Sequence, residues 1–300
     1  MGPVIMSEAL RDWGRRLLRD VPGVLAVMAH QGNGVNEPPA LADPLANYCI
    51  AVYYRDPIDL CDAQRVVHGI ASHGITFPLG RSARNMDARA ADWWPADGGV
   101  EGEHQPMVGD RTADCVFRDI EDVHERWQQV QHGRFRFSTR VGQPFRVPDF
   151  SCVAEVAVGV VVADPSGEVS ELQRRAQSYP PALGEALVAR LWEAGLLLDS
   201  GRRAADRCDV AYVAGTLAEV VVVCVHALHG HAGRWAGGGE NLVEAAGRLA
   251  AAPAGFSRTV QHILGHLGTR PDELRTAVSA ASDLLTQVAA ACRTAKPPPP

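Results

Sequence analysis

The sequence predicts an α+β protein with two domains and a short tail. Up to Pro148, runs of β-branched and aromatic residues alternate with helical patterns, which is typical of a mixed sheet with helices. Beyond Pro148, apolar residues recur at helical spacing in alanine-rich segments, which is typical of a helical bundle. We therefore expect a mixed-sheet domain over 1–148, an all-helical bundle over 149–294 and a disordered proline-rich tail over 295–300.

The strand expected at 47–54 is the clearest element of the first domain. After Asn47, its seven residues are apolar, aromatic or β-branched, and the following Arg55-Asp56-Pro57 ends the run. The other elements expected before Pro148 are a helix at 8–20, a strand at 24–28, a helix at about 57–73, a strand at 112–117 and a helix at 120–132.

Helical segments are expected throughout the second domain, with prolines and glycines between them. The run from Val156 to Val162 is ambiguous because its β-branched residues would also suit a strand; we predict it to be helical. The predicted segments are 149–163, 168–178, 181–207, 209–229, 239–251, 257–267 and 271–293.

Composition narrows the functional classes. The net charge of −6 argues against a nucleic-acid partner, and Lys296, in the expected tail, is the single lysine. Schiff-base and P-loop chemistry are thereby excluded from the folded body, so anions must be bound by Arg, His or backbone N–H groups. The seven cysteines show no C-x-x-C spacing, and no signal-peptide pattern or bilayer-length apolar stretch is evident. We expect a cytoplasmic protein with reduced thiols and no membrane partner.

Several stretches together resemble the small bacterial antibiotic and small-molecule nucleotidyltransferases of the polymerase-β superfamily. The resemblance rests on the strand at 47–54 and on Thr112-Ala113-Asp114-Cys115-Val116-Phe117-Arg118-Asp119. It continues through Tyr179-Pro180-Pro181-Ala182-Leu183, Leu191-Trp192-Glu193-Ala194 and His226-Ala227-Leu228-His229-Gly230. The resemblance implies a nucleotidyltransferase-like mixed-sheet domain followed by a helical bundle.

The catalytic motif of that family is degenerate in this chain. The resemblance implies a metal-binding Asp pair at Asn47 and Cys49, and a third carboxylate at Asp114, which is the one that remains. One carboxylate, one amide and one thiol are a poor set for Mg²⁺. Where the family has a phosphate-binding Gly-Ser, this chain has His30 and Gln31, whose bulk would block a phosphate. We therefore expect no metal and no cofactor.

Two carboxylates are candidates for acid–base catalysis. Glu155 lies in an apolar segment, where burial should raise its pKa toward neutrality; the alternative is a structural ion pair with an arginine. Asp114 is the second candidate, and pairing with an arginine is again the alternative. Glu193 is a weaker candidate for the same role. Cys49 could be a nucleophile, but a small buried core residue is the favoured interpretation.

The other predicted substrate-binding residues lie in the second domain. His226, His229 and His231 could bind a metal, but histidines at a helix end more often cap its carbonyl groups. Arg234 and Trp235 resemble a loop that contacts the substrate in related proteins. The complete predicted substrate-binding set is Asn47, Cys49, Gln31, Glu193, His229, Arg234 and Trp235.

Three functions remain open from the sequence. The first is a metal-independent enzyme, or enzyme subunit, of specialised, antibiotic-type metabolism acting on a small amine- or hydroxyl-bearing metabolite, with displacement of phosphate or sulfate as one reaction. The second is a non-catalytic binding or regulatory subunit, and the third is a residual nucleotidyltransferase. The apolar run Val220 to Val225 must be buried, either in a homo- or hetero-oligomer or in the bundle interior.

Overall fold

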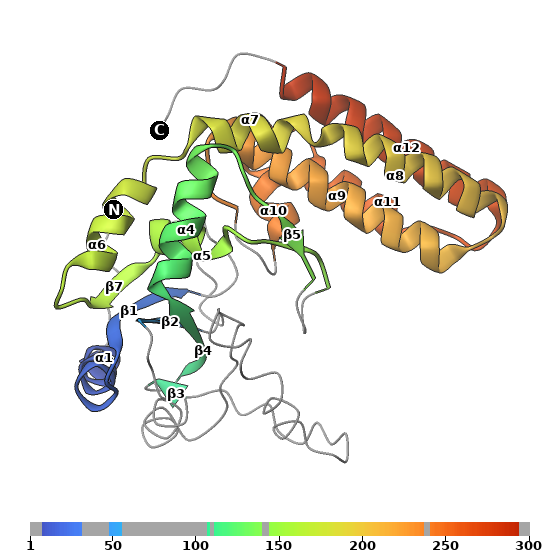
Figure 1. Ribbon diagram of the computed structural model, residues 1–300. Coiled ribbons are helices and arrows are strands. Elements are labelled where there is room, and N and C mark those ends of the chain that lie inside the picture. Colours follow the sequence, from blue (N-terminus) through green and yellow to red (C-terminus); the bar gives the residue numbers. More distant parts are fainter. Residues whose placement is uncertain are drawn as a thin grey trace, which may run out of the picture. The chain divides into compact units, whose positions relative to one another are not determined.

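The chain folds into two units, each with its own hydrophobic core, in the computed structural model (Figure 1). Residues 8–31, 48–55, 107–108, 111–139, 144–236 and 241–293 are described. The first unit comprises Met1–Trp127 and Cys152–Ser178, and the second comprises Gln128–Ser151 and Tyr179–Pro300. The chain thus passes between the units three times, whereas the sequence suggested one crossing at residue 148.

A mixed sheet of five strands, ordered β3-β4-β2-β1-β7, forms the centre of the first unit. The central β2 runs antiparallel to β1 and parallel to β4, and β7 pairs antiparallel with the other edge of β1. Ile50, Ala51 and Val52 are fully buried, which explains why the apolar run of β2 is continuous rather than alternating. The strands are β1 Val24–Gln31, β2 Tyr48–Tyr54, β3 Met107–Val108, β4 Arg111–Asp119 and β7 Val160–Ala163.

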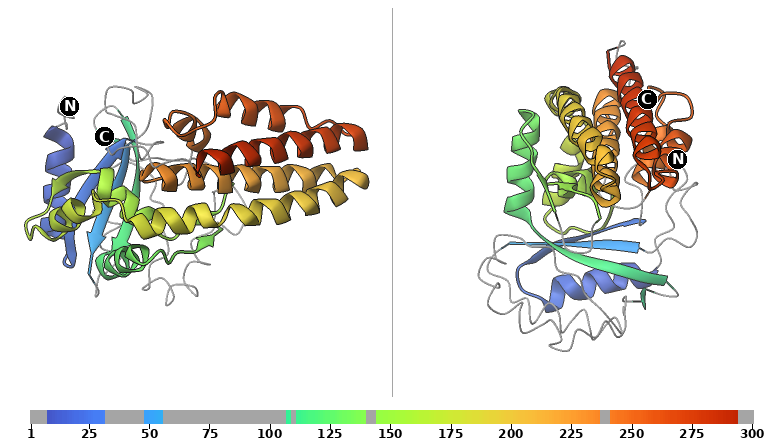
Figure 2. Two further views of the ribbon diagram at one scale, coloured as in Figure 1. Left: turned by 90° about the horizontal axis from the view of Figure 1, so that it is seen from above. Right: turned by 90° about the vertical axis from the view of Figure 1, so that its right-hand side faces the viewer.

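Helices cover both faces of this sheet. Helix α1, Glu8–Asp20, lies on one face and α5, Ser151–Val158, lies on the other (Figure 2). Trp13 and Leu17 bury the apolar side of α1, and Gly14 allows its close approach: a Cβ there would lie 2.9 Å from Cγ1 of Val162. Helices α4, Ile120–Gln131, and α6, Glu168–Ala176, follow β4 and β7 in the chain.

The segment expected to be one helix over 149–163 is a helix followed by a strand. Helix α5 ends at Val158, and the remaining β-branched residues form β7 against the edge of β1. Gly159 marks the change: its N–H donates to the Glu155 carbonyl, and a Cβ there would lie 2.9 Å from that oxygen. The strand alternative was therefore correct for Val160–Ala163, because β1 offers an unpaired edge.

The second unit is a helical bundle around α9, Val210–Ala232. Residues Val220 to Val225 are at most 5% exposed, so the bundle interior accounts for the burial of this run without a partner chain. The other helices are α7 Pro181–Ala189, α8 Leu191–Asp206, α10 Leu242–Gly247, α11 Phe256–Gly265 and α12 Pro271–Ala291. The segment expected as one helix over 181–207 is interrupted at Arg190. Among the described residues, α9 alone is long and apolar enough for a membrane span by length and composition, and 61% of that stretch is buried.

Candidate functional site

The sheet register brings three residues of the predicted catalytic motif into one row. Cys49 on β2 pairs with His30 on β1 and with Asp114 on β4. Paired positions on neighbouring strands share a face of the sheet. Asp114 therefore lies at the strand position beside Cys49. Asn47, the first residue of the strand expected at 47–54, lies outside the described residues.

The backbone of β1 continues as a strand through the positions expected to bind phosphate. His30 pairs with Cys49, and Gln31 pairs with Tyr48. A phosphate cradle needs several free N–H groups converging from a turn or a helix N-terminus. Residues 30 and 31 instead belong to a ladder. The residue types of this row, a carboxylate, a thiol and an imidazole, also form a poor set of ligands for Mg²⁺.

Glu155 forms a nearly buried ion pair with Arg118, a partner 37 residues away in sequence on β4. The Arg118 Nε–H donates to Oε2 at 2.9 Å, and Nη2 donates to Oε1 and Oε2 at 2.6 and 2.8 Å. The two side chains are 10% and 14% exposed. Burial lowers the pKa of Arg118, but the attraction of Glu155 outweighs this and leaves the pKa above its ordinary value.

This ion pair is the alternative that the sequence left open for Glu155. The sequence around Glu155 suggested an isolated carboxylate in an apolar helix, yet both of its oxygens accept hydrogen bonds from one guanidinium. Arg118 belongs to the motif segment that prompted the resemblance, but nothing local assigned it a role. Strand periodicity was the available signal: positions 114 and 118 lie on the same face of β4, which α5 covers.

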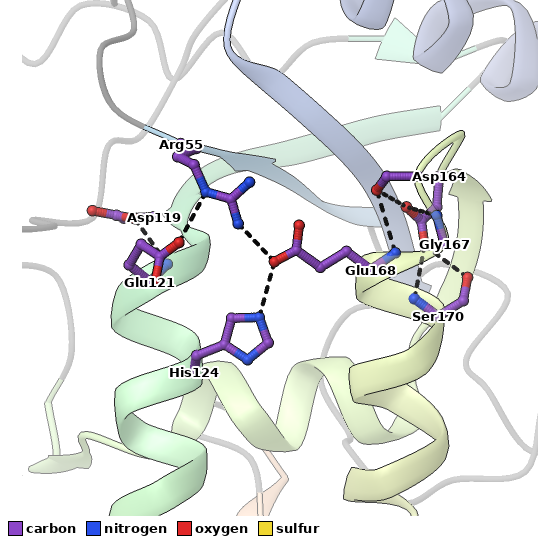
Figure 3. Close-up of polar contacts among 9 residues, drawn as sticks. Arg55, Asp119, Glu121, His124, Asp164, Gly167, Glu168 and Ser170 are labelled. Atoms are coloured by element: carbon purple, nitrogen blue, oxygen red, sulfur yellow. Dashed lines mark hydrogen bonds and ion pairs between the residues drawn. The ribbon is translucent and has the colours of Figure 1, made fainter.

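A second ionic cluster lies at the C-terminal ends of β2 and β4 and was not foreseen from the sequence (Figure 3). Arg55 donates to Glu121 at 2.9 Å and to Glu168 at 2.7 Å. His124 Nε2 lies 3.1 Å from the same Glu168 oxygen. The four side chains are 26–58% exposed, so the individual ion pairs stabilise weakly. The cluster joins β2 to α4 and α6.

Two further carboxylates beside this cluster accept hydrogen bonds from backbone N–H groups at the starts of α4 and α6 (Figure 3). Asp119 accepts from the Glu121 backbone N–H at 3.0 Å. Asp164 accepts from the N–H groups of Gly167 and Ser170 at 3.0 and 2.8 Å. These are local contacts that satisfy the first N–H groups of α4 and α6. The cluster therefore has a structural explanation.

In the second unit, Glu193 forms a bidentate ion pair with Arg190. Arg190 donates from Nε at 2.6 Å and from Nη2 at 2.8 Å. The same guanidinium lies 5.3 Å from the ring centre of Phe135 and 4.9 Å from that of Phe137. Glu193 thus pairs with a cation that lies against two aromatic rings.

His226 and His229 are buried inside the bundle, with 2% and 1% exposure. Burial, with a smaller effect from His229 and Arg190, lowers the pKa of His226 to about 3. Burial also lowers the pKa of His229 to about 4, and the backbone of Arg234 opposes this shift. Both imidazoles are therefore neutral near pH 7.

His226 and His229 make no hydrogen bond to the carbonyl groups at the end of α9. The last carbonyls of α9 are satisfied by backbone groups instead: Gly233 N–H donates to Gly230 and Arg234 N–H to His229. Gly233 supplies the left-handed conformation, φ 64°, that this type of helix end requires. Among the side chains that the structure describes, no group of three His, Cys, Asp or Glu residues could hold a metal ion.

Trp235, predicted to contact substrate from a loop, is 4% exposed. Its ring centre lies 4.8 Å from that of Tyr179 and 6.1 Å from that of Phe150. The preceding Arg234 is exposed. Trp235 therefore belongs to an aromatic cluster in the second unit. The predicted site residues are thus divided: Gln31, Cys49, Asp114 and Glu155 lie in the first unit, and Glu193, His229, Arg234 and Trp235 in the second.

Comparison with known proteins gives little further guidance. No family model matches the chain, and no curated protein matches it. Among solved structures, the chain is similar to a nucleotidyltransferase-like protein from Exiguobacterium sibiricum 255-15, with 11% identity and a TM-score of 0.39. The match covers 88% of this chain and 69% of the other. A likeness of that size carries no argument about activity.

Proposed function

We propose that this chain is a nucleotidyltransferase-like protein that has lost metal-dependent nucleotidyl transfer and acts on a small amine- or hydroxyl-bearing metabolite without a metal ion. The carrying observation is the row of His30, Cys49 and Asp114 across β1, β2 and β4. In the resembling family, that pair of neighbouring strands carries the metal-binding carboxylates. Here the arrangement of the strands is retained with a single carboxylate.

The proposed chemistry assigns proton transfer to Asp114. Asp114 accepts the proton of a substrate hydroxyl or amine while that oxygen or nitrogen forms a new bond to carbon within the same molecule. The carbon–oxygen bond to a phosphate or sulfate group breaks, and the leaving group departs with the bonding electron pair. Such a displacement uses no metal ion, cofactor or second substrate.

Glu155 has a different part in this proposal. Since both oxygens accept from Arg118, Glu155 acts as a positioning residue that fixes the guanidinium on the face of β4 that also carries position 114.

A non-catalytic binding subunit is the second candidate, and the same ion pair favours it. A carboxylate that is tied to an arginine in the resting protein contributes to folding, with no need for a reaction. Both candidate functions predict that a metabolite binds, but only the enzyme predicts that the metabolite is converted.

The test is a screen of the purified chain by native mass spectrometry against small amines, alcohols and their phosphate and sulfate monoesters, with and without Mg²⁺ and ATP. Compounds that bind are then incubated with the protein in EDTA. We expect binding without Mg²⁺ and release of phosphate or sulfate, reduced about a hundredfold or more by Asp114→Asn. Binding without turnover would favour the second candidate, and turnover that requires Mg²⁺ would contradict the proposal.

A further inference from the structure

The second unit contains buried hydrogen-bonding groups that its own fold does not use. Neither ring nitrogen of His226 and neither ring nitrogen of His229 has a hydrogen-bond partner among the described residues. Buried polar atoms in folded proteins nearly always have a partner, and each exception calls for an explanation. Because His229 is three positions after His226 on α9, the two imidazoles lie on adjacent positions of one helix face.

Arg190 brings a charged donor to the same place. The His226 ring centre lies 5.0 Å from that of Phe137, and the Arg190 guanidinium lies 4.9 Å from the same phenyl ring. Glu193 occupies Nε and Nη2 of Arg190, while Nη1 has no hydrogen-bond partner among the described residues. Arg146 lies 5.7 Å from Phe137 as well, and its Nε–H donates to Glu219 at 2.6 Å.

The chemistry of these groups defines what they can bind. A neutral imidazole offers one N–H donor and one acceptor nitrogen, and Nη1 of Arg190 offers two further N–H donors together with a positive charge. The donors suit the oxygens of an anion, and the acceptor nitrogens require a ligand with a hydroxyl group of its own. Arg190 is 27% exposed, and its charge lies close enough to His226 to help lower the pKa of that buried imidazole.

We propose that the second unit binds a small hydroxylated oxyanion, such as hydrogen phosphate or a hydroxycarboxylate, between His226 and Arg190 beside Phe137. His229 supports the hydroxyl end of this ligand from the next position on α9. The site is independent of the function proposed above, because none of its residues belongs to the first unit.

The test follows the imidazole signals of the full chain, labelled with ¹⁵N at histidine, in long-range ¹H–¹⁵N spectra. Inorganic phosphate, glycolate and acetate are added separately at constant ionic strength. We expect saturable shifts of the His226 and His229 nitrogens with phosphate and glycolate, and weaker binding of acetate, which lacks a hydroxyl. His226→Phe identifies the signals, and it should weaken binding about tenfold or more.

Arg190→Lys serves as the second variant, since a lysine retains the charge opposite Glu193 while removing Nη1; it should also weaken binding of phosphate and glycolate. His262→Phe, at an exposed position of α11, should leave the affinity unchanged. Absence of any His226 shift with phosphate and with glycolate at tens of millimolar would overturn the proposal. Equal affinity for acetate and glycolate would overturn the role given to the imidazole acceptors.

Discussion

At the scale of single residues, the Arg118–Glu155 pair decides how the first unit is understood. A carboxylate in an apolar helix looks like a catalytic base when its own segment is considered alone. The contact that changes this interpretation comes from β4, and no spacing within 149–163 reveals it. Asp114 and Cys49 could be paired in advance, because strand alternation and the family resemblance fix their positions on β4 and β2.

The ion pair should be strongly coupled energetically. Arg118→Leu or Glu155→Leu alone leaves one nearly buried charge without its partner, which costs about 3–5 kcal/mol in the free energy of unfolding. The double variant should cost clearly less than the sum of the two, as measured by urea unfolding. The exposed pair Arg174–Glu171 is the control and should show about 1 kcal/mol or less. Additive losses at Arg118 and Glu155 would contradict a functional pairing of their charges.

The buried histidines should make the protein sensitive to acid. The pKa of His226 is about 3 and that of His229 about 4 in the folded chain, against about 6.5 when unfolded. The unfolded chain therefore binds more protons below pH 6.5, so their contribution is complete above that pH and is lost as the pH falls toward 4 and 3. The loss for each histidine is about 1.4 kcal/mol per pH unit within its window.

Urea unfolding of the wild type and of His226→Phe between pH 7 and pH 5 measures this effect. We expect the difference in unfolding free energy between the two to change by about 2 kcal/mol over the interval from pH 6.5 to pH 5, in favour of the variant at low pH. His262→Gln, at an exposed position, should run parallel to the wild type. Parallel curves for His226→Phe as well would mean that His226 titrates normally in the folded chain.

At the scale of elements, helices α7 and α9 cross where Gly184 meets Gly230. A Cβ at Gly184 would lie 2.4 Å from the Gly230 carbonyl oxygen, so the backbones themselves are in contact. Gly184→Ala should therefore destabilise the chain by about 1–3 kcal/mol despite the higher helix propensity of alanine. Gly215→Ala in α9, with nothing within 4 Å of the added Cβ, should stabilise it by about 0.5–1 kcal/mol.

Thermal and urea unfolding of the two alanine variants distinguish these effects. Equal stabilisation by both would show that α7 and α9 do not approach each other this closely.

The ends of helices could be predicted where a local residue such as proline fixes them, but not where tertiary contacts fix them. The Pro181 and Pro271 starts were foreseen, because proline suits the first turn of a helix. The end of α5 at Val158 was missed, although Gly159 and the β-branched residues after it were a usable signal. The interruption at Arg190 has no local signal; its guanidinium is held by Phe135 and Phe137, more than fifty residues earlier in the chain.

At the scale of the whole molecule, the α+β class and its order of sheet before bundle followed from periodicity alone. The return of α5 and β7 to the first unit did not, since β7 joins a sheet whose edge strand lies more than a hundred residues earlier. The apolar run Val220 to Val225 in α9 likewise predicted burial, but the sequence could not distinguish a bundle interior from an interface between chains. The structure places that helix among α7, α8 and α12.

The central proposal is that this chain is a nucleotidyltransferase-like protein without the metal and phosphate sites of that class. Titration calorimetry of the full chain with ATP, in the presence of Mg²⁺ or EDTA, tests it most directly. We expect no Mg²⁺-dependent binding at micromolar ATP by the wild type. We expect partial recovery of metal binding by Asn47→Asp combined with Cys49→Asp, since three carboxylates would then be available for the metal. Micromolar, Mg²⁺-dependent binding of ATP by the wild-type chain would contradict the account.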